Sequence, residues 1–233
     1  MAQISYPENW RDIPPERWAR MMMTPEQYTA MRAERLDEIG VDYEEGVGAA
    51  ALSGPNIDLH VVTVTGREES VPTVQLDFAV PPRMDLKSVG SDGEEHVPYC
   101  IHRAPFSTHE RMVAFLIEHF AGAFPTWLAP VQVQLLTVSE HFDDYAQGIV
   151  ARLRGQMVRA ELAPSNDTLP KKIRQGTTSK IPNLLIVGER EAAEGTVTLR
   201  RYGQKQQTTM SVDEFEAKLL KTIGERRLEF ALD

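Results

Sequence analysis

The spacing of apolar residues changes abruptly between Pro125 and Pro130, and this change constrains the fold more than any other feature of the sequence. Residues 56–105 form short runs rich in β-branched residues and separated by turn signals such as Gly66, which is typical of consecutive antiparallel strands. After Pro130, strand-like and helix-like segments alternate, which indicates an α/β domain with a mainly parallel or mixed sheet. The sequence therefore predicts an α+β part and then an α/β part, with a boundary near residue 128.

Periodicity and capping signals divide each part further. Two capping boxes, Thr24 with Gln27 and Ser107 with Glu110, predict helix starts in the first part. The first helix ends at Gly40, and the second is expected to lie on the sheet because apolar residues recur along one of its faces. Residues before Thr24 show no sustained period and are expected to form a loosely docked arm. The expected strands are 56–66, 71–80, 96–106, 131–139, 158–163, 183–188 and 196–202, and the helices of the second part are 140–154, about 167–178 and the segment from Ser211.

Composition narrows the class of protein. Apolar residues make up 42% of the chain and charged residues 25%, which is the balance of an ordinary globular protein. No apolar run approaches the roughly 18 residues that span a bilayer. The single cysteine, Cys100, excludes an internal disulfide and any zinc site built from several thiolates. We therefore expect a cytoplasmic protein with no membrane partner.

Charge is distributed unevenly between the two parts. Residues 1–130 contain 10 Lys+Arg and 20 Asp+Glu, a balance of −10, whereas residues 131–233 contain 15 and 14, a balance of +1. A nucleic-acid partner is therefore expected to bind the second part. An ordinary near-neutral domain explains the same numbers, so charge alone leaves both interpretations open.

A long string around the boundary carries a family resemblance. Residues 102–136, HRAPFSTHERMVAFLIEHFAGAFPTWLAPVQVQLL, resemble the motif 3 region of threonyl-tRNA synthetases and its run into the anticodon-binding domain. SGPNIDL at 53–59 and TVQLDF at 73–78 resemble two upstream segments of that family, and KKIRQGTTSKIPNLLIVGERE at 171–191 resembles a downstream one. The resemblance covers about residues 41–228 in one register.

The resemblance implies a fold and its limits. It implies a partial class II synthetase antiparallel sheet followed by a mixed five-stranded α/β anticodon-binding domain. The expected divisions are an N-terminal arm and helix at 1–40, a truncated catalytic-like domain with motif 3 at 41–128 and an anticodon-binding domain at 129–233. Motifs 1 and 2 of the family, which build its dimer interface and hold the ATP α-phosphate, are not found in this sequence. The family's ATP and zinc are therefore not expected as cofactors of this chain alone.

Two residues match the catalytic pocket of the family. Arg111 matches the motif 3 arginine that clamps the ATP γ-phosphate, a task that suits a planar guanidinium. The alternative is an exposed helix arginine paired with Glu110 or Asp77. Gln75 matches a pocket glutamine, although an ordinary strand residue explains it as well. The family's pocket lysine is Asn56 here, which removes a cation near the phosphates. The other departures from the pattern are Ser53, Ser70, Pro72 and Ser107-Thr108.

His102 matches one of the three zinc ligands of the family, and the other two belong to the segment that this sequence lacks. Cys100 and His102 are two residues apart in a predicted strand, so they share a face and could form two corners of a metal site. A structural zinc site normally has four ligands. A packed or hydrogen-bonded histidine is therefore the default interpretation.

The anticodon-reading positions of the family are retained. Glu191 and Arg200 match a glutamate and an arginine that read anticodon bases, and their carboxylate and guanidinium suit base edges. Asn166 and Arg174 are expected to join them. The residues expected to hold the RNA backbone are Lys171, Lys172, Lys180 and Arg201. The alternative is that Glu191 and Arg200 form a cross-strand surface ion pair of small energetic weight.

Three functional interpretations remain open at this point. The chain is a non-catalytic, threonyl-tRNA synthetase-like protein that binds tRNA, with a threonine-type anticodon expected. Alternatively, it is the C-terminal part of a split or fragmentary threonine–tRNA ligase, assembled with a protein that supplies motifs 1 and 2 or with a full-length synthetase. The third interpretation is a protein-interaction module that has lost RNA binding. No DNA partner is expected.

Overall fold

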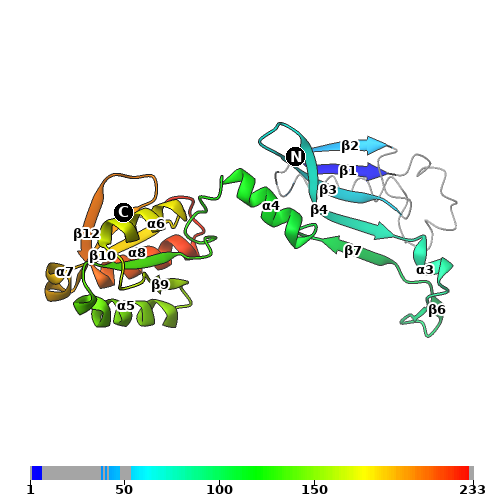
Figure 1. Ribbon diagram of the computed structural model, residues 1–233. Coiled ribbons are helices and arrows are strands. Elements are labelled where there is room, and N and C mark those ends of the chain that lie inside the picture. The colour runs from blue at the N-terminus through cyan, green and yellow to red at the C-terminus, as the bar shows by residue number, and fades with distance from the viewer. Residues whose placement is uncertain (1, 7–37, 39, 41, 48–53, 231–233) are drawn as a thin grey trace. The chain divides into compact units, whose positions relative to one another are not determined.

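The computed structural model describes residues 2–6, 38, 40, 42–47 and 54–230 (Figure 1). The chain separates into two compact units, Met1–His119 and Phe120–Asp233. This division lies N-terminal to the boundary that the sequence suggests near residue 128. The reason is that the guanidinium of Arg159 donates to the carbonyl oxygens of Trp127 and Ala129, which ties the proline-containing segment to the second unit.

The first unit is built on a five-stranded sheet with the order β2-β1-β3-β4-β7. The three strands that the sequence predicts for this unit are confirmed as the adjacent antiparallel strands β3, β4 and β7. Strand β1 pairs with β3 in antiparallel and with β2 in parallel fashion. The bounds are β1 (Ala2–Tyr6), β2 (Tyr43–Val47), β3 (Asn56–Val62), β4 (Glu68–Asp77) and β7 (Cys100–Ala104).

Three features of the first unit differ from the sequence-based expectations or lie beyond them. Residues Ala2–Tyr6 form strand β1 within the sheet, where a loosely docked arm was expected. Most of the predicted helix that begins at Thr24 falls outside the described residues. A short helix, α3 (Val80–Arg83), and a two-stranded ribbon of β5 (Ser88–Val89) and β6 (Glu95–His96) connect β4 to β7.

The helix predicted to begin with the capping box of Ser107 and Glu110 is α4 (His109–His119). Its first turn is capped by Thr108, whose hydroxyl accepts from the backbone N–H of Arg111 at 3.3 Å. None of its residues is buried, and Val113 and Ile117 are about half exposed. The predicted packing of this helix on the sheet is therefore not found within the described residues.

The second unit contains the mixed five-stranded sheet that was expected, in the order β12-β11-β10-β8-β9. Strands β9, β8 and β10 run parallel to one another, and β11 and β12 are antiparallel to their neighbours. Parallel neighbours require crossover connections, which the helices supply. The bounds are β8 (Val133–Thr137), β9 (Ala160–Leu162), β10 (Asn183–Val187), β11 (Thr196–Arg201) and β12 (Gln207–Ser211).

The helices of the second unit cover the two sheet faces unequally. One face packs against α5 (Asp143–Gly155) and α8 (Val212–Gly224) around a core that includes Leu135, Val197 and Phe215. On the opposite face α6 (Leu169–Thr178) packs over Leu136 and Leu184, which belong to β8 and β10. The remaining short elements are η2 (Glu140–Phe142), which precedes α5, and α7 (Glu189–Glu194), which connects β10 to β11. No helix in the described ranges is long and apolar enough to cross a membrane.

The two buried residues of helix α6 are a glycine and a lysine. A Cβ at Gly176 would lie only 2.6 Å from the Cδ2 of Leu184, so a side chain at this position would require Leu184 to shift. Lys172, one turn earlier, is 1% exposed, and its Nζ donates to the carbonyl and hydroxyl oxygens of Thr137, both at 3.0 Å. This placement corrects the expectation that Lys172 holds an RNA phosphate, because its ammonium group faces the protein interior.

We predict that Lys172→Ala lowers the free energy of unfolding by about 2–5 kcal/mol, because it opens a cavity and leaves the buried oxygens of Thr137 without a donor. Lys171→Ala is the matched control: Lys171 is exposed and pairs with Asp167, so its loss should change stability by only about 0.5 kcal/mol. Urea unfolding followed by circular dichroism measures both. Equal midpoints for the two variants would contradict the buried placement of Lys172.

Candidate nucleic-acid interface

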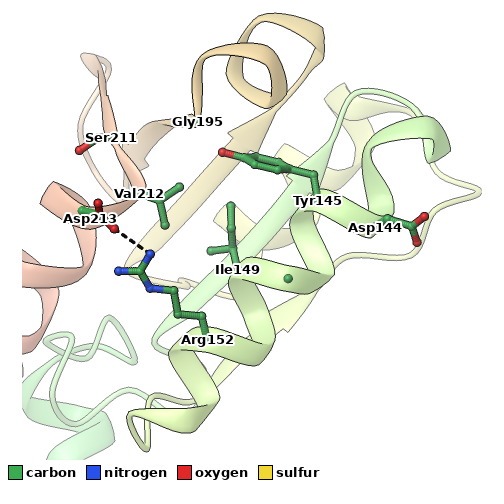
Figure 2. Close-up of a pocket in the computed structure, with 9 residues that line it drawn as sticks. Asp144, Tyr145, Ile149, Arg152, Gly195, Ser211, Val212 and Asp213 are labelled. Carbon is green, nitrogen blue, oxygen red and sulfur yellow. Dashed lines mark ion pairs between the residues drawn. The ribbon is translucent and has the colours of Figure 1, made fainter.

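The face of the second unit that α5 and α8 cover contains a cavity of about 400 Å³ (Figure 2). Its one cationic lining residue, Arg152, pairs with Asp213 at 2.7 Å and with Glu216, which raises the pKa of the guanidinium. The hydroxyl of Tyr145 donates to the carbonyl oxygen of Thr196 at 3.1 Å. Because these polar groups already have protein partners, the cavity offers no free cation to an anionic ligand. The sequence analysis did not anticipate it.

The opposite face presents polar side chains beside α6. Along β11, Val197 and Leu199 are buried in the core, so Thr198 and Arg200 point to the other side of the sheet. Their partners across the β11–β12 pair are Thr209 and Gln207, and both of these are exposed. The hydrophobic cluster on this face draws its sheet residues from β8 and β10. The polar face of β11 and β12 is therefore the part of the sheet that can meet a ligand.

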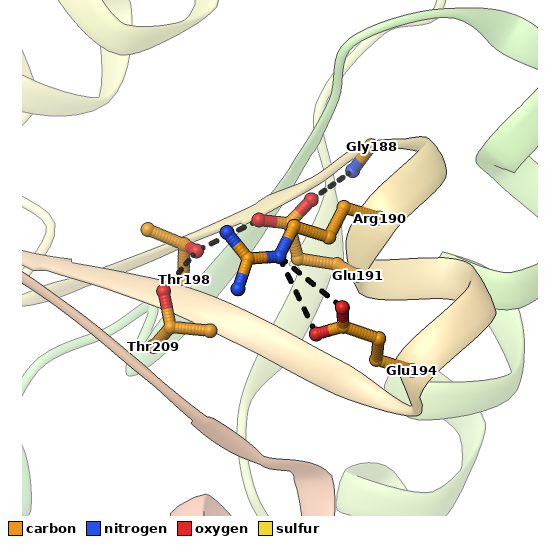
Figure 3. A network of polar contacts seen from close by, with 6 residues as sticks. All are labelled: Gly188, Arg190, Glu191, Glu194, Thr198 and Thr209. Atoms are coloured by element: carbon orange, nitrogen blue, oxygen red, sulfur yellow. Dashed lines mark hydrogen bonds and ion pairs between the residues drawn. The ribbon is translucent and has the colours of Figure 1, made fainter.

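Glu191 is held in place at the border of this polar face (Figure 3). Its Oε2 accepts from the backbone N–H of Gly188 at 3.0 Å, and its Oε1 accepts from the hydroxyl of Thr198 at 2.8 Å. Burial pushes the pKa of Glu191 upward, but the hydrogen bonds from Thr198 and the backbone outweigh burial, so the pKa lies below its ordinary value. The side chain is therefore a fixed, ionised hydrogen-bond acceptor at neutral pH.

The alternative of an ion pair between Glu191 and Arg200 is not found. The guanidinium of Arg200 forms no hydrogen bond or ion pair with any residue that the structure describes, although the residue is half buried. The neighbouring Arg190 pairs instead with Glu194 at 3.3 Å (Figure 3). Arg200 thus keeps all of its side-chain donors available on the polar face.

The other expected RNA contacts fall into different places. Asn166, Lys171 and Arg174 are exposed, on α6 and the loop before it. The Lys171 ammonium donates to Asp167 at 2.6 Å, and this hydrogen bond lowers the pKa of the Asp167 carboxyl. Arg201 follows Arg200 on a strand and therefore faces the other side, where its Cζ lies 5.7 Å from the ring centroid of Phe230. The six residues expected to contact RNA beside Glu191 and Arg200 therefore do not form one group, and they are Asn166, Lys171, Lys172, Arg174, Lys180 and Arg201.

In the first unit, His102 is a hydrogen-bonded histidine. Its Nε2 lies 2.9 Å from Oδ2 of Asp77, which is buried and also accepts from the backbone N–H groups of Ala79 and Val80. Burial raises the pKa of Asp77, but the hydrogen bonds from Val80, His102 and Ala79 lower it by more than burial raises it. The pKa therefore lies below its ordinary value, and the carboxylate stays ionised. Cys100 lies opposite Asp77 in the β4–β7 register.

The donors in the described part of the first unit do not fit a zinc ion. Among the described residues no group of three His, Cys, Asp or Glu side chains is placed to hold a metal, and a structural zinc needs about four ligands. Gln75 is half buried on β4, opposite His102 and Asn56. Arg111 is exposed in the first turn of α4 and pairs with neither Glu110 nor Asp77.

Comparisons with known proteins agree with this architecture. Residues 10–120 match the family described as tRNA synthetase class II core domain (G, H, P, S and T), and residues 132–222 match the family described as Anticodon binding domain. The threonine–tRNA ligase of Streptococcus sanguinis is 52% identical over 203 residues, which is 86% of this chain and 31% of that protein. The Streptococcus gordonii enzyme is 52% identical over 199 residues, covering 85% and 31%. The chain thus spans about a third of the length of these relatives.

Two solved structures are also similar. The RNA-binding domain of threonyl-tRNA synthetase from Cryptosporidium parvum superimposes with a TM-score of 0.76 at 28% identity, covering 100% of this chain and 56% of that one. A putative threonyl-tRNA synthetase from Aeropyrum pernix has a TM-score of 0.69 at 23% identity, covering 96% and 54%, and supports the fold alone. The chain therefore belongs to the threonyl-tRNA synthetase family and consists of part of a class II core domain followed by an anticodon-binding domain.

Proposed function

We propose that this chain binds tRNA carrying a threonine-type anticodon through its second unit, and that it does not charge tRNA by itself. The observation that carries the proposal is that an anchored, ionised Glu191 borders the polar face of β11 and β12, on which the Arg200 side chain has no partner among the described residues. Both lie inside the segment that matches the anticodon-binding family. A tRNA is the partner that such domains imply.

The chemistry of the two side chains suits the edges of unpaired bases. A carboxylate accepts from exocyclic amines and ring N–H groups, and a guanidinium donates to base carbonyls and N7. Because Gly188 and Thr198 already fix the Glu191 carboxylate, binding a base does not have to order that side chain. Base contacts of this kind specify sequence, whereas exposed cations such as Lys171 and Arg174 hold phosphates without reading sequence.

The first unit keeps only a remnant of a synthetase active site. Arg111 and Gln75 match family pocket positions, but Asn56 stands where the family has a lysine, and none of the 233 residues matches the motif 2 arginine. Without these cations, charge that develops on the ATP phosphates has few protein groups to stabilise it. We therefore expect this chain alone to form no threonyl-adenylate.

A second candidate function is the C-terminal part of an assembled threonine–tRNA ligase, and the surface of the first unit favours it. Val71 is the one buried hydrophobic residue among the described residues of this unit, while Val62 and Ile101 are more than 60% exposed. Apolar side chains left in water cost about 25 cal/mol per Å² relative to burial. A protein that supplies the rest of a class II core would cover them. Affinity capture from native cells that recovers such a protein would support this candidate, whereas capture of unrelated proteins without tRNA would favour the interaction module.

We predict that Arg200→Ala weakens binding of a threonine tRNA by about 1–3 kcal/mol and has little effect on other tRNAs, because it removes a base contact. Lys171→Ala should weaken all tRNAs together and reduce the salt dependence by about one charge. The control is Lys221→Ala, in the last turn of α8. It should change neither the affinity for tRNA nor the preference among tRNAs. Filter binding at several salt concentrations, with wild-type and anticodon-swapped transcripts, measures these effects. Equal affinity for every transcript, unchanged by Arg200→Ala, would argue against base reading.

We also predict that the purified chain gives no threonine-dependent ATP–pyrophosphate exchange, because the α-phosphate arginine and two of the family's zinc ligands are missing. A complete threonyl-tRNA synthetase assayed in parallel serves as the positive control. Exchange above background that persists after repeated purification would show that the remnant site is catalytic.

A further inference from the structure

A second cavity of about 340 Å³ lies in the second unit, away from Glu191. It lies between the segment that follows Phe120 and the turn after β11, next to residues that follow α8. Its volume falls at the lower end of the range for small-ligand pockets. The lining includes two cations, three aromatic rings and one carboxylate, which belong to Lys180, Arg201, Phe120, Phe124, Tyr202 and Glu229.

The two cations of this pocket carry more donors than the protein uses. The guanidinium of Arg201 is half buried over the Phe230 ring and makes no hydrogen bond or ion pair with any described residue. Burial lowers the pKa of Arg201, and the charge of Glu229 only partly offsets this effect. The ammonium of Lys180 donates to the carbonyl oxygen of Ala121, which leaves two of its three N–H donors. With Glu229 counted, the lining carries two positive charges and one negative charge, a balance of +1.

The aromatic side chains supply a second kind of contact. The rings of Phe120 and Phe124 lie 5.9 Å apart with an interplanar angle of 57°. Tyr202 is 37% exposed, so part of its ring is open to solvent. Proteins bind unstacked RNA bases by stacking them on aromatic rings or guanidinium planes while cations contact the phosphate. This pocket holds both kinds of group within one small volume.

We propose that this pocket takes one unstacked nucleotide of the bound RNA, with its base against the aromatic rings and its phosphate on Arg201 and Lys180. The inference rests on the proposed function, since it assumes that the second unit binds an RNA loop. It adds a contact site that is separate from the base-reading pair, because Arg201 and Arg200 face opposite sides of the sheet. A phosphate there gives the half-buried guanidinium of Arg201 an acceptor that the described residues do not supply.

The test compares affinities of the full chain for a threonine tRNA transcript. Tyr202→Leu removes the ring and should weaken binding about 5- to 150-fold, the range for loss of one stacked base. Tyr202→Phe keeps the ring and should bind like the wild type. Arg201→Gln should weaken binding and reduce the salt dependence by about one charge. The control is Tyr99→Leu, which alters an exposed tyrosine of the first unit, and thermal unfolding of each variant checks that the fold is intact.

Two further arms separate the possible sources of the nucleotide. Transcripts carrying 4-thiouridine, crosslinked by near-ultraviolet light and digested, should attach to peptides containing Tyr202 or residues 120–126. Titration with AMP, GMP, CMP and UMP tests for a free mononucleotide. Mononucleotide binding that Tyr202→Leu abolishes, with tRNA affinity unchanged, would overturn the RNA source.

The outcomes also separate this inference from the proposed function. Wild-type affinity in both Tyr202→Leu and Arg201→Gln, together with lost anticodon preference in Arg200→Ala, would overturn the pocket and uphold the anticodon face. Absence of tRNA binding by the wild-type chain would overturn both proposals.

Discussion

The arrangement of the second unit depends on the close seating of α6 over β8 and β10. Gly176 lies where a Cβ would contact the Leu184 side chain too closely, and Lys172 donates from its ammonium group to Thr137 at the end of β8. Because α6 packs over β8 and β10 alone, it covers only part of this face of the five-stranded sheet. The polar residues of β11 and β12 can therefore face solvent while Val197 and Leu199, on the other side of the same strand, complete the core.

Much of this fold could be predicted from local patterns. The strands at β8, β10 and β11 and the helices α5 and α8 follow from the spacing of the apolar residues that they bury. Strand β9 and helix α6 were also predicted, although α6 buries Lys172 and Gly176 rather than apolar side chains. Strand β12 could not be found in this way, since Met210 is its one buried residue and the rest of the edge strand is exposed. Strand β1 was also missed, because pairing with β2 and β3, which are distant in sequence, defines it.

The candidate site shows the same division between local and tertiary information. Glu191 and Arg200 could be chosen from the resemblance, but their roles as anchored acceptor and partner-free donor depend on Gly188, Thr198 and the strand alternation. Composition does not show which of the adjacent Lys171 and Lys172 is buried. Lys172 shares a helix face with Gly176, four residues later, and that spacing was the one available sign that it points inward. The separation of Arg201 from Arg200 follows from strand geometry once the strand is known.

The Glu191 carboxylate fixes the directions in which the hydroxyl hydrogens of Thr198 and Thr209 point. A threonine hydroxyl has one hydrogen, and Thr198 gives its hydrogen to the Glu191 carboxylate. The 2.9 Å contact between the hydroxyls of Thr198 and Thr209 must then take its hydrogen from Thr209. The oxygen of Thr209, on the exposed edge strand, therefore presents only lone pairs to an incoming group. The hydrogen bonds of the half-buried Glu191 carboxylate thus make the hydroxyl of Thr209 a neutral hydrogen-bond acceptor at the exposed edge of the sheet. Thr209 lies opposite Thr198, which is two residues before Arg200 on β11.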